Sequence, residues 1–178
     1  MTSTGTKVTE AKATEAKGKA PRKGLVIVAS TRASAGIYAD RSGPIAVEFL
    51  RSQGFDTPDP IVVPDADIKQ AVDEAFALEP RPQVILTSGG TGITEDDLTV
   101  EAVAPHLERE LPGIVYAFWQ EGLKNIPTAV VSRAVAGVTG RTFAMTLPGS
   151  TGGVKDGCKV LEPLLNPVVD MLEGTHEH

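Results

Sequence analysis

Cysteine is almost absent from this chain, and its scarcity limits the kinds of protein that the sequence can describe. Cys158 is the only cysteine, so no disulfide can form within the chain, which is typical of proteins of the reducing cytoplasm. The three histidines show no ligand spacing, since two of them fall in the last three residues, and no zinc site is predicted. We therefore expect a cytoplasmic protein in which Cys158 is a small buried helix residue rather than a nucleophile.

Long apolar runs and aromatic side chains are also scarce. No run approaches the roughly 18 apolar residues that a membrane span needs, and no apolar core of a secretory signal lies near residue 1, so we expect neither. Aromatic residues make up 4% of the chain and hydrophobic residues 41%, which predicts an aliphatic core. A chain of 178 residues fits a single domain, because division usually begins beyond roughly 250 residues.

Positive charge is concentrated in the first 23 residues. These residues contain six Lys or Arg and two Glu, a balance of +4, so residues 24–178 carry −10 of the net charge of −6. Because a DNA-binding domain usually has a basic folded face, no nucleic-acid partner is expected. Residues 1–23 contain no aromatic residue and are predicted to form a disordered basic tail, which either solubilises the protein or contacts an acidic partner.

From residue 24 onward, short apolar runs alternate with amphipathic stretches, which indicate buried strands and helices respectively. Strands are expected at 24–30, 59–63, 83–87, 128–132 and 142–147. Helices are expected at 44–53, at 67–78 with a capping box at Asp67–Gln70, from 99 with a bend near Pro105, at 113–124, and within 153–173, where Pro163 and Pro167 interrupt the pattern. This order predicts a parallel sheet with helices on both faces, in a domain of residues 24–174 followed by a flexible C-terminus at 175–178.

Four loops should meet at the carboxyl edge of this sheet, where open α/β folds bind their ligands: Ser30–Asp40, Pro64–Asp67, Ser88–Asp97 and Pro148–Gly152. The last two are rich in glycine, with the sequences SGGTG at 88–92 and PGSTGG at 148–153. Glycine lets backbone N–H groups converge on a phosphate or carboxylate, although each loop could also be a plain tight turn. Neither loop matches the Walker A or GxGxxG pattern.

Carboxylates flank these loops. Asp65 begins the loop after the second strand, and Asp97 follows the first glycine loop. One interpretation is a Mg²⁺-assisted transfer of a phosphoryl or nucleotidyl group; the other is that both aspartates cap helices. Arg32 and Arg133 either supply positive charge to a phosphate-rich substrate or are solvated surface residues.

The order of these motifs resembles that of the MoaB/MogA family of molybdopterin-binding proteins, which includes molybdopterin adenylyltransferases. The matching stretches cover essentially all of residues 24–172. They are Arg32–Gly36 with Tyr38 and Asp40, Val63–Asp65, Thr87–Gly92 followed by Asp97 and Thr99, Ser132–Gly137, and Leu147–Ser150.

The resemblance implies a three-layer α/β/α sandwich with a mostly parallel sheet, assembled as a homotrimer or a hexamer. It also implies adenylylation of the molybdopterin phosphate, with ATP as co-substrate, Mg²⁺ as cofactor and pyrophosphate as product. Asp65 and Asp97 match the positions expected to act in catalysis and to orient the metal. The positions expected to bind substrate are Ser30, Arg32, Asp40, Ser88, Gly89, Gly90, Thr91, Gly92, Thr99, Ser132, Arg133, Pro148, Gly149 and Ser150.

Several positions depart from the family's usual pattern. Asp96 and Val100 replace an arginine and a proline that many members have, and Tyr116 and Trp119 replace a glutamate and an arginine. An aspartate at 96 repels phosphate where an arginine would attract it. Two alternatives to an enzyme therefore stay open: a molybdopterin-binding module with weak or no catalysis, and an oligomeric interaction protein. The Tyr116–Trp119 stretch could form a subunit contact or an edge on which the pterin stacks.

Overall fold

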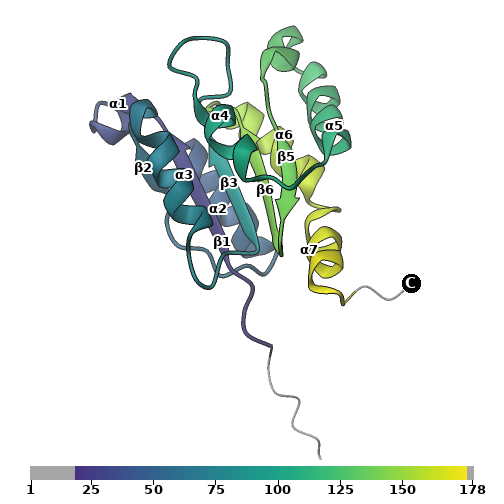
Figure 1. The fold of residues 1–178 in the computed structure, drawn as a ribbon. Helices are drawn as coiled ribbons and strands as arrows, with labels where there is room; N and C mark the ends of the chain where they lie inside the picture. Colours follow the sequence, from purple (N-terminus) through teal and green to yellow (C-terminus); the bar gives the residue numbers. More distant parts are fainter. Residues whose placement is uncertain (1–18, 176–178) are drawn as a thin grey trace, which may run out of the picture.

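A computed structural model describes residues 19–175. Its centre is a six-stranded sheet with the order β2-β1-β3-β6-β5-β4 (Figure 1). The four parallel strands are β1 (Gly24–Ala29), β2 (Ile61–Val63), β3 (Val84–Ser88) and β6 (Thr142–Leu147). At one edge, β5 (Ala136–Thr139) and β4 (Arg109–Glu110) add antiparallel pairings. The predicted mostly parallel sheet is confirmed.

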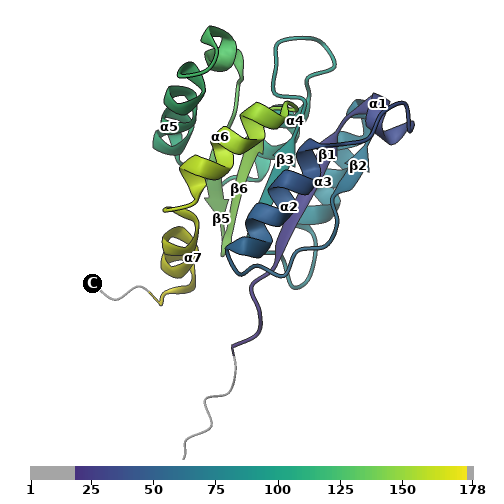
Figure 2. The same ribbon diagram turned by 180° about the vertical axis from the view of Figure 1, so that it is seen from behind.

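Helices cover both faces of the sheet. On one face lie α2 (Ser42–Ser52), α5 (Pro112–Leu123), α6 (Thr151–Leu161) and α7 (Leu165–Glu173), and Figure 2 shows α2 and α6 crossing the sheet. On the other lie α3 (Ile68–Phe76) and α4 (Thr99–Val103). The short helix α1 (Thr31–Ser34) and the 3₁₀ turns η1 (Asp65–Asp67), η2 (Ala104–His106) and η3 (Pro127–Val131) lie in connections. The predicted three-layer α/β/α sandwich is therefore confirmed.

The apolar runs of the sequence form two cores, one on each face of the sheet. Along β1, Val26 and Val28 contact the α2 side, whereas Leu25 and Ile27 contact the α3 side. All six residues of β1 and all six of β6 are buried. Because alternate side chains of a strand point to opposite faces, a strand covered on both sides must be apolar throughout, as these strands nearly are.

A strand was expected at 128–132, and that expectation is wrong because residues 127–131 adopt another structure. They form the 3₁₀ turn η3, with Pro127 in its first turn and with Val130 and Val131 48% and 43% exposed. Proline's fixed φ suits the start of a helical turn, and valines that look like a buried strand in sequence lie on the surface here. The antiparallel strands β4 and β5 escape the sequence pattern because they are short and β5 contains glycine.

Two expectations about helix ends have different outcomes. The predicted break is confirmed at Pro163, since α6 ends at Leu161 and α7 begins at Leu165, but Pro167 lies in the first turn of α7 and does not interrupt it. The predicted capping box at Asp67 is wrong, because the Asp67 side chain makes no capping bond. Its partner Gln70 instead donates from Nε2 to Glu74 Oε1 at 2.9 Å. The turn η1 leads directly into α3 and leaves no room for the reciprocal bonds of a capping box.

The folded domain begins before the predicted boundary at residue 24. Arg22 donates to Asn166 Oδ1 at 2.9 Å and forms ion pairs with Asp170 and Glu173 of α7, while Lys23 forms a strand-like bridge with Asp56. The remaining predictions for the tail and for the flexible C-terminus fall mainly on residues 1–18 and 176–178, which lie outside the described residues. Within residues 19–175, no helix is both long enough and apolar enough to cross a membrane.

Candidate functional site

The glycine loop after β3 can be built only with glycine at two positions. Gly89 and Gly90 have φ of +90° and +69°, a region that side chains disfavour. A Cβ at Gly89 would lie 2.3 Å from the Ala29 carbonyl oxygen, and one at Gly90 would lie 2.1 Å from Thr99 Oγ1. Thr99 is fully buried beneath Gly90 and donates its backbone N–H to the Gly90 carbonyl at 3.0 Å. The predicted site residue Thr99 thus supports the loop from below.

Asp97 closes the same loop. Its Oδ2 accepts hydrogen bonds from the Thr94 N–H at 2.9 Å and from Thr94 Oγ1 at 2.7 Å. Burial alone would raise the pKa of Asp97, but the hydrogen bonds from Thr94 and from the Gly92 backbone, together with the charge of Arg133, hold this pKa below its ordinary value. The carboxylate is therefore ionised at neutral pH, and it does not cap α4, which has no side-chain cap.

Arg133 holds the glycine loop from the other side. Its Nε donates to the Gly92 carbonyl at 2.6 Å, its Nη2 donates to the Asp97 carbonyl at 2.8 Å, and the guanidinium pairs with Glu101. The hydrogen bond to Glu101 raises the pKa of Arg133, and Arg133 in turn lowers the pKa of Glu101. The guanidinium of Arg133, predicted to bind phosphate, thus bonds instead to two backbone carbonyls and to the Glu101 carboxylate.

Residues 132–133 join this loop to α5. Ser132 Oγ donates to Thr91 Oγ1 at 3.0 Å, and the Arg133 N–H donates to the Thr91 carbonyl at 2.8 Å. Trp119 Nε1 donates to the Ser132 carbonyl at 2.9 Å, which gives this departure from the family pattern a supporting role. Tyr116 is 61% exposed and makes no such contact, whereas its neighbour Phe118 is buried.

The second glycine loop leads into α6. Ser150 Oγ accepts from the Gly153 N–H at 3.0 Å and is the N-cap of the helix. The two loops touch, since a Cβ added to Gly149 would lie 3.4 Å from Gly89 Cα, and the Gly89 N–H donates to the Leu147 carbonyl at 3.0 Å. The predicted convergence of the two glycine loops at one edge of the sheet is therefore found.

A buried hydroxyl pair lies behind this contact. Ser88 Oγ is 2.9 Å from Ser42 Oγ and 3.1 Å from the Pro148 carbonyl oxygen. Ser42 Oγ in turn lies 3.0 Å from Asp40 Oδ1, which also accepts from the N–H groups of Ser42 and Gly43 at 3.0 and 3.2 Å. Asp40, predicted to bind substrate, thus holds the first turn of α2, and sequence reasoning did not identify Ser42.

The larger of two adjoining cavities has a volume of about 590 Å³. The first and second glycine loops form one side, and the α5–η3 segment forms an apolar side that sequence reasoning did not anticipate. Its lining includes the predicted residues Gly90, Thr91, Gly92, Asp97, Ser132, Pro148, Gly149 and Ser150, and also Phe118, Ile126, Val131 and Asp156. Asp97 and Asp156 are its only charged lining residues.

The smaller cavity, of about 320 Å³, lies between the end of β1, residues 38–42 at the start of α2, and the second glycine loop, with Gly149 common to both cavities. Ser30, Tyr38, Asp40, Arg41, Ser42 and Thr151 complete its polar wall. Ser30 Oγ is 2.9 Å from Tyr38 Oη, and the Arg32 guanidinium lies 5.4 Å from the centre of the Tyr38 ring. Arg32, predicted to bind substrate, does not line this cavity but contacts Tyr38, which does.

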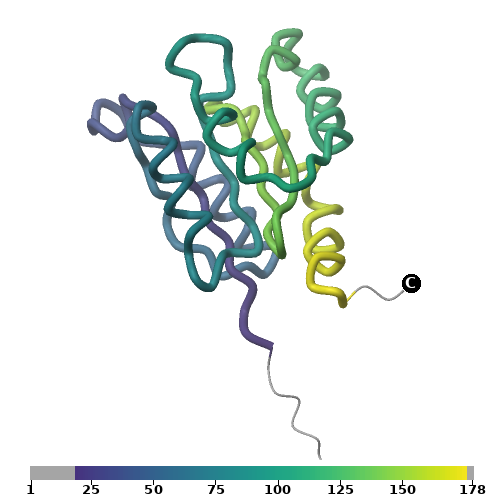
Figure 3. The backbone as a smooth tube through the Cα atoms, in the orientation of Figure 1, coloured from purple at the N-terminus to yellow at the C-terminus, as the bar shows by residue number. Residues whose placement is uncertain are grey.

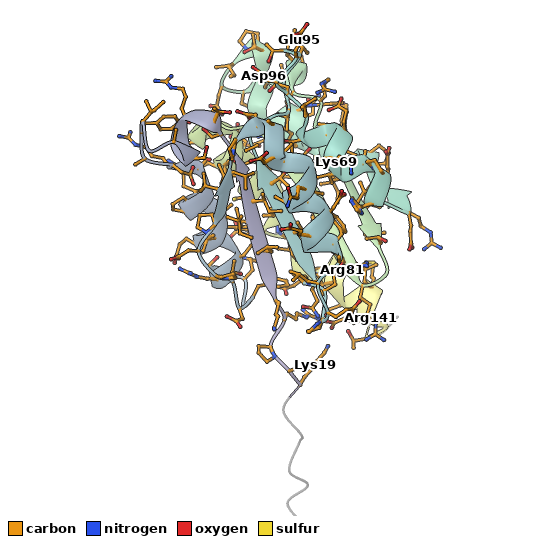
Figure 4. The ribbon with its side chains drawn as sticks, turned by 60° about the vertical axis from the view of Figure 1, so that its left-hand side comes forward. Lys19, Lys69, Arg81, Glu95, Asp96 and Arg141 are labelled. Carbon is orange, nitrogen blue, oxygen red and sulfur yellow. The ribbon has the colours of Figure 1, made fainter. Side chains whose placement is uncertain are left out.

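Asp65 lines neither cavity. Its Oδ2 accepts from the Thr31 N–H at 2.9 Å and from Thr31 Oγ1 at 2.7 Å, so Asp65 caps the short helix α1 from a neighbouring loop. Among residues 19–175, no three His, Cys, Asp or Glu side chains gather in a way that could hold a metal. Asp96 and Glu95 lie at the exposed tip of the loop between β3 and α4, which rises above the strand ends (Figure 3). Figure 4 places both at the opposite end of the molecule from Lys19, Arg81 and Arg141.

Comparison with known proteins gives concordant matches. The molybdenum cofactor biosynthesis bifunctional protein of Chlorobaculum tepidum is 35% identical over 149 residues, which are 84% of this chain but 48% of that protein, so the chain spans about half of this relative. The molybdopterin adenylyltransferase of Helicobacter pylori strain 26695 is 30% identical over 154 residues, 85% of this chain and 88% of that protein. The structure of the molybdopterin biosynthesis Mog protein from Mycobacterium ulcerans matches with a TM-score of 0.80 and 39% identity, over 88% of this chain and 99% of that chain.

The family model described as the probable molybdopterin binding domain matches residues 25–167. That range begins in β1 and ends within α7, and it contains both glycine loops and both cavities. The chain therefore belongs to the family of probable molybdopterin binding domains.

Proposed function

We propose that this protein acts in molybdenum cofactor biosynthesis, binding molybdopterin and transferring an adenylyl group from Mg-ATP to its phosphate. The observation that carries the proposal is that two cavities at the carboxyl ends of the parallel strands share Gly149 as a common wall. A transfer between two substrates needs two neighbouring sites whose reacting groups meet, because most of the rate enhancement comes from positioning. The names of the relatives support molybdopterin as one substrate.

In the proposed reaction, an oxygen of the molybdopterin phosphate attacks the α-phosphorus of ATP. The bond between the α-phosphorus and the bridging oxygen breaks, and pyrophosphate leaves with the electron pair. The reacting phosphates would meet beside Gly149, close to the N-terminus of α6. Backbone N–H groups and the helix dipole there favour negative charge, and the adjacent glycine loops let phosphates approach the backbone closely.

The charges of the larger cavity indicate what Mg²⁺ would contribute. Asp97 and Asp156 line this cavity without any Lys or Arg, so a polyphosphate entering it meets only negative side chains. Mg²⁺ is commonly bound by one or two carboxylates together with substrate phosphates and water, and the ionised Asp97 fits that role. When bound, the ion would neutralise charge on the phosphates. Asp65 would act indirectly, by holding Thr31 and the segment that carries Arg32.

The experiment is pyrophosphate release from Mg-ATP with purified molybdopterin. We expect release by the wild type and loss of release in Asp97→Asn, with molybdopterin binding retained. The matched control is Asp96→Asn, which removes the adjacent carboxylate at the loop tip and should leave turnover within about twofold. Equal loss in both variants would contradict the proposed role of Asp97, and absence of molybdopterin binding in the wild type would contradict the function itself.

A binding module with weak catalysis is the second candidate, and one observation favours it. Arg133 is paired with Glu101, and the larger cavity has no cationic lining residue to stabilise charge in the transition state. Tight molybdopterin binding without pyrophosphate release at any Mg²⁺ concentration would identify the protein as such a module.

Assembly into a homotrimer or hexamer is also proposed. Tyr116, Leu123, Ile126, Val130 and Val131 are exposed apolar residues on α5, η3 and the segment joining them. Contiguous exposed apolar surface commonly marks a protein contact.

A further inference from the structure

We propose that Ser88 is a positioning residue that couples the occupancy of the smaller cavity to the wall of the larger one. The inference rests on the proposed function for the identity of the two ligands. The structural basis of the inference is independent of that function. The buried Ser88 hydroxyl lies between Ser42, which lines the smaller cavity, and the carbonyl of Pro148, which precedes the shared residue Gly149.

When ionised, the Asp40 carboxylate can only accept hydrogen bonds. Ser42 Oγ lies 3.0 Å from Asp40 Oδ1 and therefore donates its one proton to that carboxylate. The lone pairs of Ser42 Oγ then face Ser88 Oγ, 2.9 Å away. Ser88 is the donor in this pair, because the proton of Ser42 is already used.

Ser88 has one proton and two acceptors. The first acceptor is Ser42 Oγ, and the second is the Pro148 carbonyl oxygen at 3.1 Å. Only one of them can receive a well-aligned hydrogen bond at a time. Ser88 is 1% exposed and Ser42 is 4% exposed, so bulk water does not readily replace the bond that is not made.

The two acceptors belong to different cavities. Ser42 lines the smaller cavity, while Pro148 lines the larger one and precedes Gly149, which lines both. A ligand that takes the lone pair of Ser42 Oγ that faces Ser88, or that draws Ser42 Oγ away from Ser88, would release the Ser88 proton, which would then turn to the Pro148 carbonyl. That bond would hold the Pro148–Ser150 segment against β3 and fix the larger cavity's wall.

Coupling of this kind is reciprocal, so a ligand in the larger cavity that fixes the same segment would strengthen binding in the smaller one. A single hydrogen bond limits its size to about fivefold in affinity. The segment lies beside the first glycine loop, since a Cβ at Gly149 would be in ordinary contact with Gly89 Cα at 3.4 Å.

The first test needs no ligand and uses amide hydrogen exchange in Gly149–Gly153. In Ser42→Ala the competing acceptor is gone, so Ser88 donates to the Pro148 carbonyl throughout and exchange in this segment should become up to about fivefold slower. In the double variant Ser42→Ala/Ser88→Ala no proton is left for that carbonyl, and the slowing should be lost. Ser52→Ala, at the far end of α2, is the matched control. Slowing that persists in the double variant, or faster exchange in Ser42→Ala, would overturn the proposal.

The second test measures coupling directly. The affinity for a non-reactive ATP analogue with a methylene group between its α- and β-phosphorus atoms is determined with and without molybdopterin. We expect molybdopterin to raise this affinity in the wild type and in Ser88→Thr, which keeps the hydroxyl, but not in Ser88→Ala. Retained coupling in Ser88→Ala would overturn the proposal. If the wild type binds neither ligand, the proposed function fails, and the exchange experiment alone decides the role of Ser88.

Discussion

Arg133 holds the glycine loop by donating from Nε to the carbonyl oxygen of Gly92 at 2.6 Å. Its Nη2 donates a second hydrogen bond to the Asp97 carbonyl, and the guanidinium forms an ion pair with Glu101. Arg133 thus holds both ends of the segment 92–97, whose Asp97 carboxylate lines the larger cavity. An arginine that was a candidate phosphate ligand from the sequence therefore fixes the shape of the loop through its contacts within the protein.

Replacing Arg133 by alanine should loosen this loop. Two backbone carbonyls lose their donors and Glu101 loses its partner, so we expect a loss of about 1–3 kcal/mol in the free energy of unfolding. The affinity for Mg-ATP should also fall, because Asp97 is no longer held in place. Urea unfolding and ligand titration measure the two effects. Arg141→Ala, on the exposed turn between β5 and β6, is the control and should change neither.

Gly90→Ala should destabilise the protein by about 2–4 kcal/mol, because its φ of +69° is unfavourable for alanine and its Cβ would lie 2.1 Å from Thr99 Oγ1. The matched change Gly152→Ala, where a Cβ meets open space within α6, should be neutral or stabilise by up to about 1 kcal/mol. Thermal and chemical unfolding of the two variants compare the sites. Similar stabilities would mean that the loop can move away from Thr99.

Binding of Mg-ATP should depend on pH only in the acid range. The hydrogen bonds from Thr94 and Gly92 and the charge of Arg133 lower the pKa of Asp97 in spite of its burial. A carboxylate with a lowered pKa contributes stability that is present above its unfolded pKa of about 3.9 and is lost as the pH falls through its folded pKa. Titration from pH 8 downward should therefore show constant Asp97-dependent affinity until below about pH 4. A midpoint near neutrality would contradict this role of Asp97.

Cys158 should be inert in the native protein. Burial in α6 raises the pKa of its thiol to about 12, so almost no thiolate is present at pH 8. A thiol-specific chromogenic reagent should react with it only after the protein unfolds in denaturant. Rapid stoichiometric reaction without denaturant would show that the site opens.

Val130→Asp should weaken any self-association through the α5–η3 surface without altering the cavity. Val130 is 48% exposed and does not line the larger cavity, whereas its neighbour Val131 does. Light scattering after gel filtration measures the mass of the assembly. An assembly of unchanged mass would place the subunit contact on another surface, and Ile37→Asp, on the distant loop after α1, is the control.

Much of the fold could be predicted from the chain because its signals are local. Short apolar runs predicted β1 and β6, and a proline predicted the break before α7. Both signals act within a few residues. The antiparallel strands β4 and β5 could not be predicted, since short strands are defined by the neighbour they pair with. The strand expected at 128–132 is wrong for a related reason: valines favour a strand only where they can pair within a sheet.

The sequence by itself determined where the glycine loops lie and that they meet at the carboxyl edge of the sheet, because strands that alternate with helices run parallel and each loop directly follows a strand. Only the tertiary structure decided what the charged residues do. Arg133 donates its hydrogen bonds to backbone carbonyls, and Asp65 caps α1 instead of lining a cavity. Phe118 lines the larger cavity although it belongs to no sequence motif. Such roles depend on contacts between residues up to 41 positions apart, as for Arg133 and Gly92, and these contacts exist only after folding.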